Sequence, residues 1–379
     1  MTKDIAGGRR VALVHDWLTG MRGGEKCLEV LCELFPDAPI FTLLYNRGTS
    51  SPTIARHDIH TSFVQHLPFA SEGYRRYLPL FPFAIERFDL AEFDLVISSS
   101  HCVAKAVRTP TEALHICYCH TPMRYIWNQY DEYFGPGKAG ILTRLAMSSM
   151  VGRLRRWDVA TATRPDYYIA NSNNVKARIK SIYGRDAEVI YPPVNVAGVE
   201  ASLTDDGYYL MVTALVPYKQ VDIAIEAFNR LKQRLIIVGS GPDAVRLREL
   251  AGPTIEFRGW VADAEVHALY AGCTALIFPG EEDFGIVPVE AMAHGKPVIA
   301  YAKGGALETV KETHGAETGI LFGKLSSDAL IEAMERCAQR KFDPFAIRAQ
   351  VLSFDRDEYK ARMARFIEAR LSPRFAGSD

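Results

Sequence analysis

The sequence has 379 residues, and at ~150 residues per domain this length predicts two or three domains. Apolar residues make up 48% and charged residues 23%, proportions that exclude a largely disordered or fibrous chain. No apolar run approaches the ~18 residues of a membrane-spanning helix, and none follows the basic residues 1–10, so we expect no cleaved secretion signal. Seven cysteines without a Cys-x-x-Cys pair indicate reduced thiols, and we therefore expect a cytoplasmic protein.

The net charge of −1 conceals a difference between the two halves. Residues 1–195 hold 23 basic and 19 acidic residues, whereas residues 196–379 hold 21 and 26. Neither half is basic enough to indicate a nucleic-acid partner. The mildly basic first half could contact an anionic membrane or an anionic substrate, although an ordinary scatter of surface charge explains it equally well.

Apolar runs followed by helical patterns recur along the chain. In the first half, a strand over 11–15 precedes a glycine-rich turn over 20–24 and a helix over 25–35, and further strands are predicted over 95–98, 114–119 and 167–170. The segment 49–91, which is rich in Pro and aromatic residues, is less regular. In the second half, the pattern predicts strands over 209–213, 235–238, 255–257, 275–278 and 298–301, with helices over 220–232, 243–250, 263–271, 287–294 and 306–312.

This alternation predicts an α/β protein with parallel sheets that are covered by helices on both faces. The two prolines at 192–193 interrupt regular structure between the halves. We therefore expect two Rossmann-like domains, residues 1–193 and 194–345, followed by a terminal segment 346–379 that contains a helix. Open sheets of this kind bind ligands at the carboxyl ends of their strands, so two of them are expected to hold a ligand in a cleft between the domains.

The most informative segment is 279–293, which follows a predicted strand and opens a helix. Glu282 is expected in the loop and Glu290 in the first turns of the helix. Free backbone N–H groups at the helix start would attract an anion; they belong to Phe284, Gly285, Ile286 and Val287. Two carboxylates beside such a helix end suit a ligand with both hydroxyl and phosphate groups. For Glu290 alone, an acid that stabilises a helix start is the preferred interpretation.

Residues 282–293 resemble the signature of the retaining glycosyltransferases with the GT-B fold, the glycosyl transferases group 1 family. The resemblance continues at residues 216–219, 238–242, 257–261, 296–300, 304–305 and 318–322. In the first half, residues 15–18, 23–26 and 119–127 resemble the bacterial mannosyltransferase-like branch that builds surface polysaccharides and lipopolysaccharide. The resemblance implies the GT-B fold, in which the final helix often crosses back onto the first domain.

The resemblance also implies roles for individual residues. Glu282 matches the glutamate that contacts the donor sugar, Glu290 the one that binds the nucleotide ribose, and Lys219 the lysine that binds the donor diphosphate. Such a lysine stabilises the leaving group, because charge builds on the diphosphate as the glycosidic bond breaks. The remaining matches are His120 near the reacting sugar, Val261 at the base, and Gly23 and Gly24 at the diphosphate and acceptor.

One position departs from the family pattern. Ala214 stands where many relatives carry an arginine that serves as a second phosphate cation. Either another cation replaces it, or diphosphate binding depends more heavily on Lys219 and the helix ends. We expect no metal or cofactor: Cys117, Cys119 and His120 do not form a metal set on an alternating strand, and the acids at 355–357 are explained as the start of a helix over 358–371.

Two segments, 74–83 and 142–157, combine basic residues with apolar or aromatic ones. The second carries Arg144, Arg153, Arg155 and Arg156 beside Leu145, Met150, Leu154 and Trp157. Each could lie on an anionic membrane, at the inner face of the plasma membrane. A core-facing helix with a solvated basic face is an equally good interpretation.

The resemblance predicts transfer of a hexosyl group, mannose from GDP-mannose, to a lipid-linked or polysaccharide acceptor with retention of anomeric configuration and without metal. Two alternatives stay open. One is a GT-B nucleotide-sugar epimerase that acts on UDP-N-acetylhexosamine without an acceptor. The other is a non-catalytic two-domain sugar-binding protein, which has little need for a leaving-group cation such as Lys219.

Overall fold

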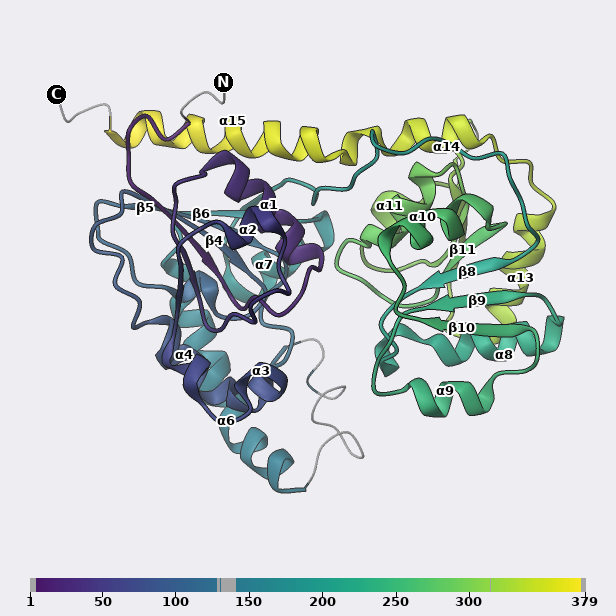
Figure 1. Ribbon diagram of the computed structural model, residues 1–379, viewed down its shortest axis with the longest axis horizontal. Coiled ribbons are helices and arrows are strands. Elements are labelled where there is room, and N and C mark those ends of the chain that lie inside the picture. The colour runs from purple at the N-terminus through teal and green to yellow at the C-terminus, as the bar shows by residue number, and fades with distance from the viewer. Residues whose placement is uncertain (1–4, 128–129, 131–140, 314, 376–379) are drawn as a thin grey trace. The chain divides into compact units, whose positions relative to one another are not determined.

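The computed structural model describes residues 5–127, 130, 141–313 and 315–375, and the side chains of 141–147 and 372–375 lie outside that description. The chain forms two compact units, residues 1–193 with 357–379, and residues 194–356. Each unit is built around a sheet of parallel strands with helices beside it (Figure 1). The expected α/β architecture of two Rossmann-like units is confirmed.

The first unit has a seven-stranded parallel sheet in the order β3-β2-β1-β4-β5-β6-β7. Its strands are β1 (Val11–His15), β2 (Ile40–Thr42), β3 (Ile59–Thr61), β4 (Leu95–Ser100), β5 (Leu114–Cys119), β6 (Tyr167–Ala170) and β7 (Ala187–Val189). The register pairs His15 with Ser99, and Ser100 with Cys119. The ends of β1, β4 and β5 therefore lie next to one another at the carboxyl edge of the sheet.

Three longer helices accompany this sheet: α1 (Gly23–Leu34), α6 (Ile141–Ala160) and α7 (Asn173–Tyr183). Ser172 caps α7 by accepting a hydrogen bond from the Val175 N–H at 3.1 Å, and Gly184 ends it in the left-handed conformation. The irregular segment 49–91 contains β3 and several short helices: α2 (Pro52–Ala55), η1 (Phe63–His66), α3 (Ala70–Gly73), η2 (Tyr74–Leu80) and α4 (Phe81–Ile85). Pro52 and Pro82 stand in the first turns of α2 and α4, where a missing N–H costs no helical hydrogen bond. Two further 3₁₀ turns are η3 (Ala104–Ala106) and η4 (Thr161–Thr163).

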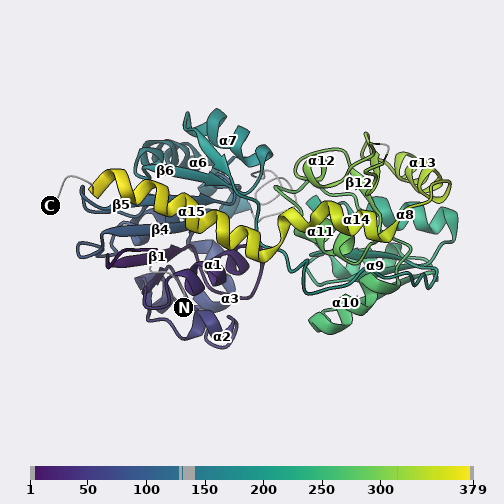
Figure 2. The same cartoon turned by 90° about the horizontal axis from the view of Figure 1, so that it is seen from above.

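The long final helix α15 (Arg356–Phe375) packs on this first unit (Figure 2). Its Tyr359, Met363, Phe366, Ile367 and Leu371 share one hydrophobic cluster with side chains of α1. Lys360 Nζ also lies 2.9 Å from the carboxylate of Glu33. The terminal segment 346–379 is thus divided, because α14 (Pro344–Val351) and η6 (Leu352–Phe354) belong to the second unit.

The second unit has a six-stranded parallel sheet in the order β10-β9-β8-β11-β12-β13. Its strands are β8 (Tyr209–Val212), β9 (Leu235–Val238), β10 (Ile255–Gly259), β11 (Ala275–Phe278), β12 (Val298–Tyr301) and β13 (Gly319–Phe322). Its other helical elements are η5 (Pro217–Lys219), α8 (Val221–Leu231), α9 (Ala244–Leu250), α10 (Asp263–Gly272), α11 (Ile286–Ala293), α12 (Ala306–Thr309) and α13 (Ser327–Ala338). The helix predicted over 306–312 is shorter, because Val310 is extended and the Lys311 N–H donates to Thr318 Oγ1.

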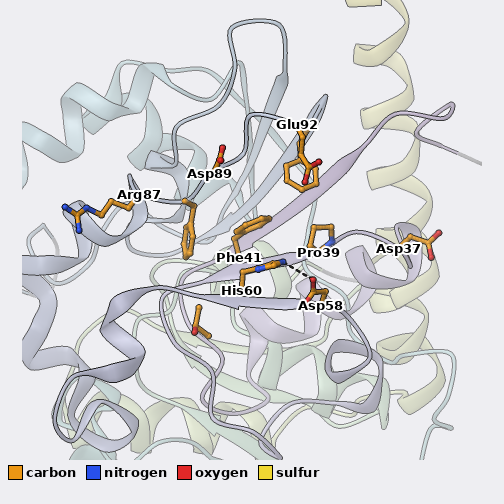
Figure 3. Close-up of a pocket in the computed structure, with 11 residues that line it drawn as sticks. Asp37, Pro39, Phe41, Asp58, His60, Arg87, Asp89 and Glu92 are labelled. Atoms are coloured by element: carbon orange, nitrogen blue, oxygen red, sulfur yellow. Dashed lines mark ion pairs between the residues drawn. The ribbon is translucent and has the colours of Figure 1, made fainter.

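Both sheets reverse their strand order at one point, between β1 and β4 in the first unit and between β8 and β11 in the second. Sheets of this kind bind ligands outside the carboxyl ends of the strands at that switch point. A hollow of about 640 Å³ in the first unit lies elsewhere (Figure 3). Its lining includes Pro39, Asp58 and Phe93, which precede β2, β3 and β4, so it is not the site that this rule predicts.

Candidate active site

In the second unit, Lys219 and Glu282 come together at the switch point. Lys219 ends η5 after β8, and Glu282 lies in the loop after β11. The Lys219 ammonium forms an ion pair with Glu282 Oε1, and these side chains are only 16% and 19% exposed. Gly280 permits the close approach of the two loops, because a Cβ atom there would lie 3.1 Å from Lys219 Cα. The sheet topology thus places a cation and a carboxylate where an anionic ligand is expected.

The loop after β12 holds the Glu282 segment in place. The Gly305 N–H donates to the Glu282 carbonyl at 2.9 Å, and Gly304 has a φ of +63° in a position where a Cβ would collide with the same carbonyl. Lys303 in this loop lies 3.1 Å from the carboxylate of Glu281. A second ammonium group, which the sequence analysis did not single out, therefore lies beside the Glu282 loop, whereas Ala214 is exposed and provides no charge.

The N-terminus of α11 lies in the same chain segment. Gly285 precedes the helix with a φ of +90°, and Ile286 and Val287 are half-buried in its first turn. The Phe284 side chain is buried and packs edge-on against Phe354, with ring centroids 5.4 Å apart. Phe284 can therefore offer a ligand its backbone but not its ring.

Glu290 lies in the second turn of α11 and is half-buried. Its Oε2 accepts a hydrogen bond from the hydroxyl of Tyr270, 3.0 Å away on α10. Val261 is half-buried just beyond the end of β10, next to Trp260, whose side chain is 80% exposed. The carboxyl edge of this sheet thus carries Lys219, Glu282, Val261 and the start of the helix that bears Glu290.

In the first unit, His120 follows β5 and is buried. Its Nε2 lies 2.9 Å from Ser99 Oγ at the end of β4. A Cβ atom on Gly24 would lie 3.6 Å from the same Nε2 and 3.5 Å from Cε1 of His15. The glycine turn at Gly23 and Gly24, which starts α1, therefore brings backbone against two imidazole rings at the carboxyl edge of the sheet.

Asp16 organises this edge, although the sequence analysis assigned it no role. The carboxylate is fully buried and accepts hydrogen bonds from four consecutive backbone N–H groups, those of residues 101–104, at 2.6–2.9 Å. His101 Nδ1 lies 3.1 Å from the same carboxylate. Burial alone would raise the pKa of Asp16, but the charge of His101 and hydrogen bonds from its ring and N–H hold that pKa well below its usual range.

The two most deeply buried histidines of this edge are neutral at neutral pH. Burial, together with the charge of His101, lowers the pKa of His15 to about 4 and outweighs the opposing effects of Asp16 and the Ser99 backbone. Burial, followed by the charges of His101 and His15, also lowers the pKa of His120 well below its usual value. A neutral imidazole can both donate and accept a hydrogen bond, which suits contact with a sugar hydroxyl.

Two motifs that could suggest a metal site have structural roles. Asp355 Oδ2 accepts the N–H groups of Val196 and Ala197 at 3.1 and 2.7 Å. Cys117 and Cys119 lie in a hydrophobic cluster. Across the described residues, His, Cys, Asp and Glu form no group of three or more that could hold a metal ion.

The two basic segments differ in structure. In the second, Leu154 is buried and Trp157 Nε1 donates to Glu86 at 2.8 Å, whereas Arg153 and Arg156 are exposed, so the helix has one side toward the core and a solvated basic side. The side chains of Arg144 and Leu145 lie outside the described residues. The first segment and its flanks expose Phe69, Leu80 and Phe83. Among the helices of the described residues, none combines the length with the apolar composition that a membrane-spanning helix needs.

Comparisons with known proteins match both units. A family model described as Glycosyl transferases group 1 matches residues 198–343, and one described as Glycosyltransferase Family 4 matches residues 21–197. The O-antigen chain mannosyltransferase C of Escherichia coli is 24% identical over 187 residues, which cover 47% of this chain and 50% of that protein. A GDP-mannose-dependent alpha-(1-6)-phosphatidylinositol monomannoside mannosyltransferase of Mycobacterium tuberculosis is 34% identical over 141 residues, which cover 32% and 36%.

The chain thus spans half the length, or less, of these two relatives. The structural similarity to known proteins covers more of the chain than the sequence similarity to these two relatives does. Sucrose-phosphate synthase from Thermosynechococcus elongatus matches the structure with a TM-score of 0.71 at 18% identity, over 96% of this chain and 100% of that one. Together the two family models match residues 21–343 and show that the chain belongs to the glycosyl transferases group 1 family, while the structural match shows the GT-B fold.

Proposed function

We propose that this glycosyltransferase transfers mannose from GDP-mannose to a hydroxyl of a lipid-linked or polysaccharide acceptor, with retention at the anomeric carbon. The observation that carries the proposal is the Lys219–Glu282 pair at the switch point of the second sheet. A partly buried ammonium at this position can stabilise the charge that develops on a departing diphosphate. A protein that only binds sugar has little use for such a group.

In this proposal the bound donor replaces the ion pair between Lys219 and Glu282. The diphosphate binds Lys219 and the N–H groups at the start of α11. The sugar hydroxyls donate to Glu282, and the ribose hydroxyls donate to Glu290. The backbone at Val261 contacts the base. Lys303 is the second cation available beside the Glu282 loop, where the family arginine is replaced by Ala214. The relatives described as mannosyltransferases, one of them GDP-mannose-dependent, support the choice of donor.

The first unit is assigned to the acceptor and the reacting sugar, with His120, Gly23 and Gly24 as the contacting residues. The acceptor oxygen forms a bond to the anomeric carbon on the face from which the diphosphate leaves. The bond between that carbon and the phosphate oxygen breaks, and its electron pair goes to the diphosphate. A phosphate oxygen of the donor takes the proton of the acceptor hydroxyl, so the step needs no metal in this proposal.

The test is a donor panel with the full chain. GDP-mannose, UDP-glucose, UDP-N-acetylglucosamine and ADP-glucose are incubated with bacterial lipid extract, with and without EDTA, and the product linkage is determined by NMR. We expect an α-mannoside from GDP-mannose and no effect of EDTA. A β-linked product would refute retention, and loss of activity with EDTA would refute a metal-free step. Conversion of UDP-N-acetylglucosamine to its epimer without an acceptor would identify the protein as an epimerase. Binding of a nucleotide sugar without any reaction would identify it as a sugar-binding protein.

We further propose that the segment 69–87 contacts an anionic membrane, at the inner face of the plasma membrane. Phe69, Leu80 and Phe83 are 72%, 40% and 55% exposed, and the exposed basic residues Arg75, Arg76 and Arg87 lie in the same segment. Apolar side chains that enter the interface and cations that meet anionic lipid act together in such contacts.

Co-sedimentation with phosphatidylglycerol vesicles tests this second proposal. The Phe69→Ser/Phe83→Ser variant should lose most of the bound fraction, because both side chains are exposed in the free protein. The matched control is Val245→Ser in the second unit, a residue that is 71% exposed. Equal binding of all three proteins would show that the contact lies elsewhere.

A further inference from the structure

Tyr270 is the fixed partner of a residue that the proposed function places at the nucleotide. Its side chain on α10 is fully buried, and its hydroxyl donates to Glu290 Oε2 on α11 at 3.0 Å. The Tyr270 ring also stacks on His294, with centroids 5.7 Å apart and planes 21° apart. His294 Nε2 in turn lies 2.9 Å from His267 Nδ1 on α10. Two helices therefore fix both the ring and the hydroxyl.

The protonation states make this hydroxyl a constant donor. Burial, followed by the negative charge of Glu290 and the hydrogen bond to it, raises the pKa of Tyr270 well above its usual value. Tyr270 therefore keeps its proton throughout the physiological range. Burial and then His267 lower the pKa of His294 to about 4, so His294 is neutral there. The neutral Tyr270 hydroxyl thus donates to a carboxyl oxygen of Glu290, and a hydrogen bond of a hydroxyl to a carboxylate is stronger than one between neutral groups.

We propose that Tyr270 is a positioning residue that orients the Glu290 carboxylate toward the ribose hydroxyls, and that it thereby sets the preference of this site for ribonucleoside over dideoxyribonucleoside diphosphates. The inference rests on the proposed role of Glu290. A half-buried glutamate can rotate about its terminal bond, and occupation of Oε2 by a fixed donor holds the plane of the carboxylate. Without Tyr270, the carboxylate loses this restraint and is held less firmly in the orientation that accepts from the ribose.

The experiment compares binding of nucleotides that differ only in the ribose. GDP, UDP and ADP are titrated into the full-length protein by calorimetry, and the tightest of them is then compared with its 2′,3′-dideoxy form. Loss of hydrogen bonds to a charged group predicts that the unsubstituted protein prefers the ribo form by about 10- to 100-fold. In Tyr270→Phe this ratio should fall at least about threefold, through weaker binding of the ribo form with little change for the dideoxy form.

Tyr208→Phe is the matched control. The Tyr208 hydroxyl donates to the Leu269 carbonyl at 2.9 Å, so this substitution also removes one hydroxyl that contacts α10, but it leaves Glu290 untouched. Its ribose preference should equal that of the unsubstituted protein. In Glu290→Ala, the further substitution Tyr270→Phe should leave the ratio unchanged, because the group that Tyr270 orients is gone.

The outcomes separate this inference from the function on which it rests. An unsubstituted protein that prefers the ribo form, together with an equal preference in Tyr270→Phe, overturns the positioning role while the donor site stands. An equal fall in Tyr208→Phe shows a general effect on α10 and also overturns it. If GDP, UDP and ADP all fail to bind, the proposed function falls, and this inference falls with it.

Discussion

Asp16→Ala is the substitution that tests the organisation of the first unit most severely. The Asp16 carboxylate is fully buried and accepts the N–H groups of residues 101–104. Of these four residues, 102–104 are themselves buried, so their N–H groups cannot turn to water after the substitution. The variant therefore leaves a cluster of unsatisfied donors and removes the anion beside His101.

The cost can be worked out from these contacts. Each buried donor left without a partner costs about 1–3 kcal/mol, so four would cost about 4–12 kcal/mol if nothing relaxed. His101 is partly exposed and can recover some of this by contact with water. The loop can also admit water into the space that the carboxylate vacates. We therefore expect Asp16→Ala to lower the free energy of unfolding of the first unit by about 3–5 kcal/mol, the range found when a buried ion pair loses one partner.

Urea unfolding followed by tryptophan fluorescence measures this loss. Trp17 is buried next to Asp16 and packs edge-on against His101, with centroids 4.4 Å apart, so its emission reports on this region. Asp94→Ala is the matched control. Asp94 accepts the Arg10 N–H at 2.9 Å, but its side chain is 41% exposed, so the expected cost is below about 1 kcal/mol. An Asp16→Ala variant with a free energy of unfolding within about 1 kcal/mol of the parent would show that these buried hydrogen bonds contribute little to stability.

Three further predictions concern catalysis, pH and a buried ion pair. Lys219→Ala should lower kcat/KM for transfer about 10²- to 10³-fold, with partial activity in Lys219→Arg, and activity within a few-fold of the parent would contradict its role. Because His15 and His115 are buried with pKa values of about 4, against 6.5 when unfolded, the unfolded chain binds more protons between these values. Stability measured in urea at a series of pH values should therefore fall as the pH drops from 6.5 to 4, by up to about 3 kcal/mol per imidazole. A flat profile would contradict this. Lys105 Nζ lies 3.1 Å from Asp158 Oδ1 and both side chains are buried, so Lys105→Met should cost about 3–5 kcal/mol and the double variant with Asp158→Asn should recover part of it. If the single and double variants lost equal amounts of unfolding free energy, the Asp158 carboxylate would not be an unpaired buried charge in Lys105→Met.

The sequence predicted the elements that carry a strong local signal. The run Leu235–Val238 is a strand with the predicted bounds, because four consecutive apolar residues suit a strand buried on both faces. The three-residue strands β2, β3 and β7 were missed, since three residues are too few to show a period. The helix over 306–312 was predicted too long. Beyond its observed end, the Lys311 N–H donates to Thr318 Oγ1, and no pattern within 306–312 reveals this contact with a later residue.

In the candidate site, too, local sequence patterns do not reveal contacts between residues that are distant in sequence. Lys219 and Glu282 each stand out from their local motif, but their ion pair depends on β8 and β11 being neighbours in the sheet. Asp16 could be noticed as an acid after a buried strand, yet its partners lie 85–88 residues away along the chain. Tyr270 is 20 residues from Glu290 on a different helix, and no local pattern joins them. The residues that hold the site together were therefore visible only in the fold.

A crystal structure of the protein soaked with GDP-mannose would show whether Lys219, Glu282 and Glu290 surround the nucleotide sugar. We expect the diphosphate within hydrogen-bonding distance of Lys219 Nζ, the mannose hydroxyls on Glu282, and the ribose on Glu290. A donor bound in full occupancy away from these three side chains would overturn these assignments.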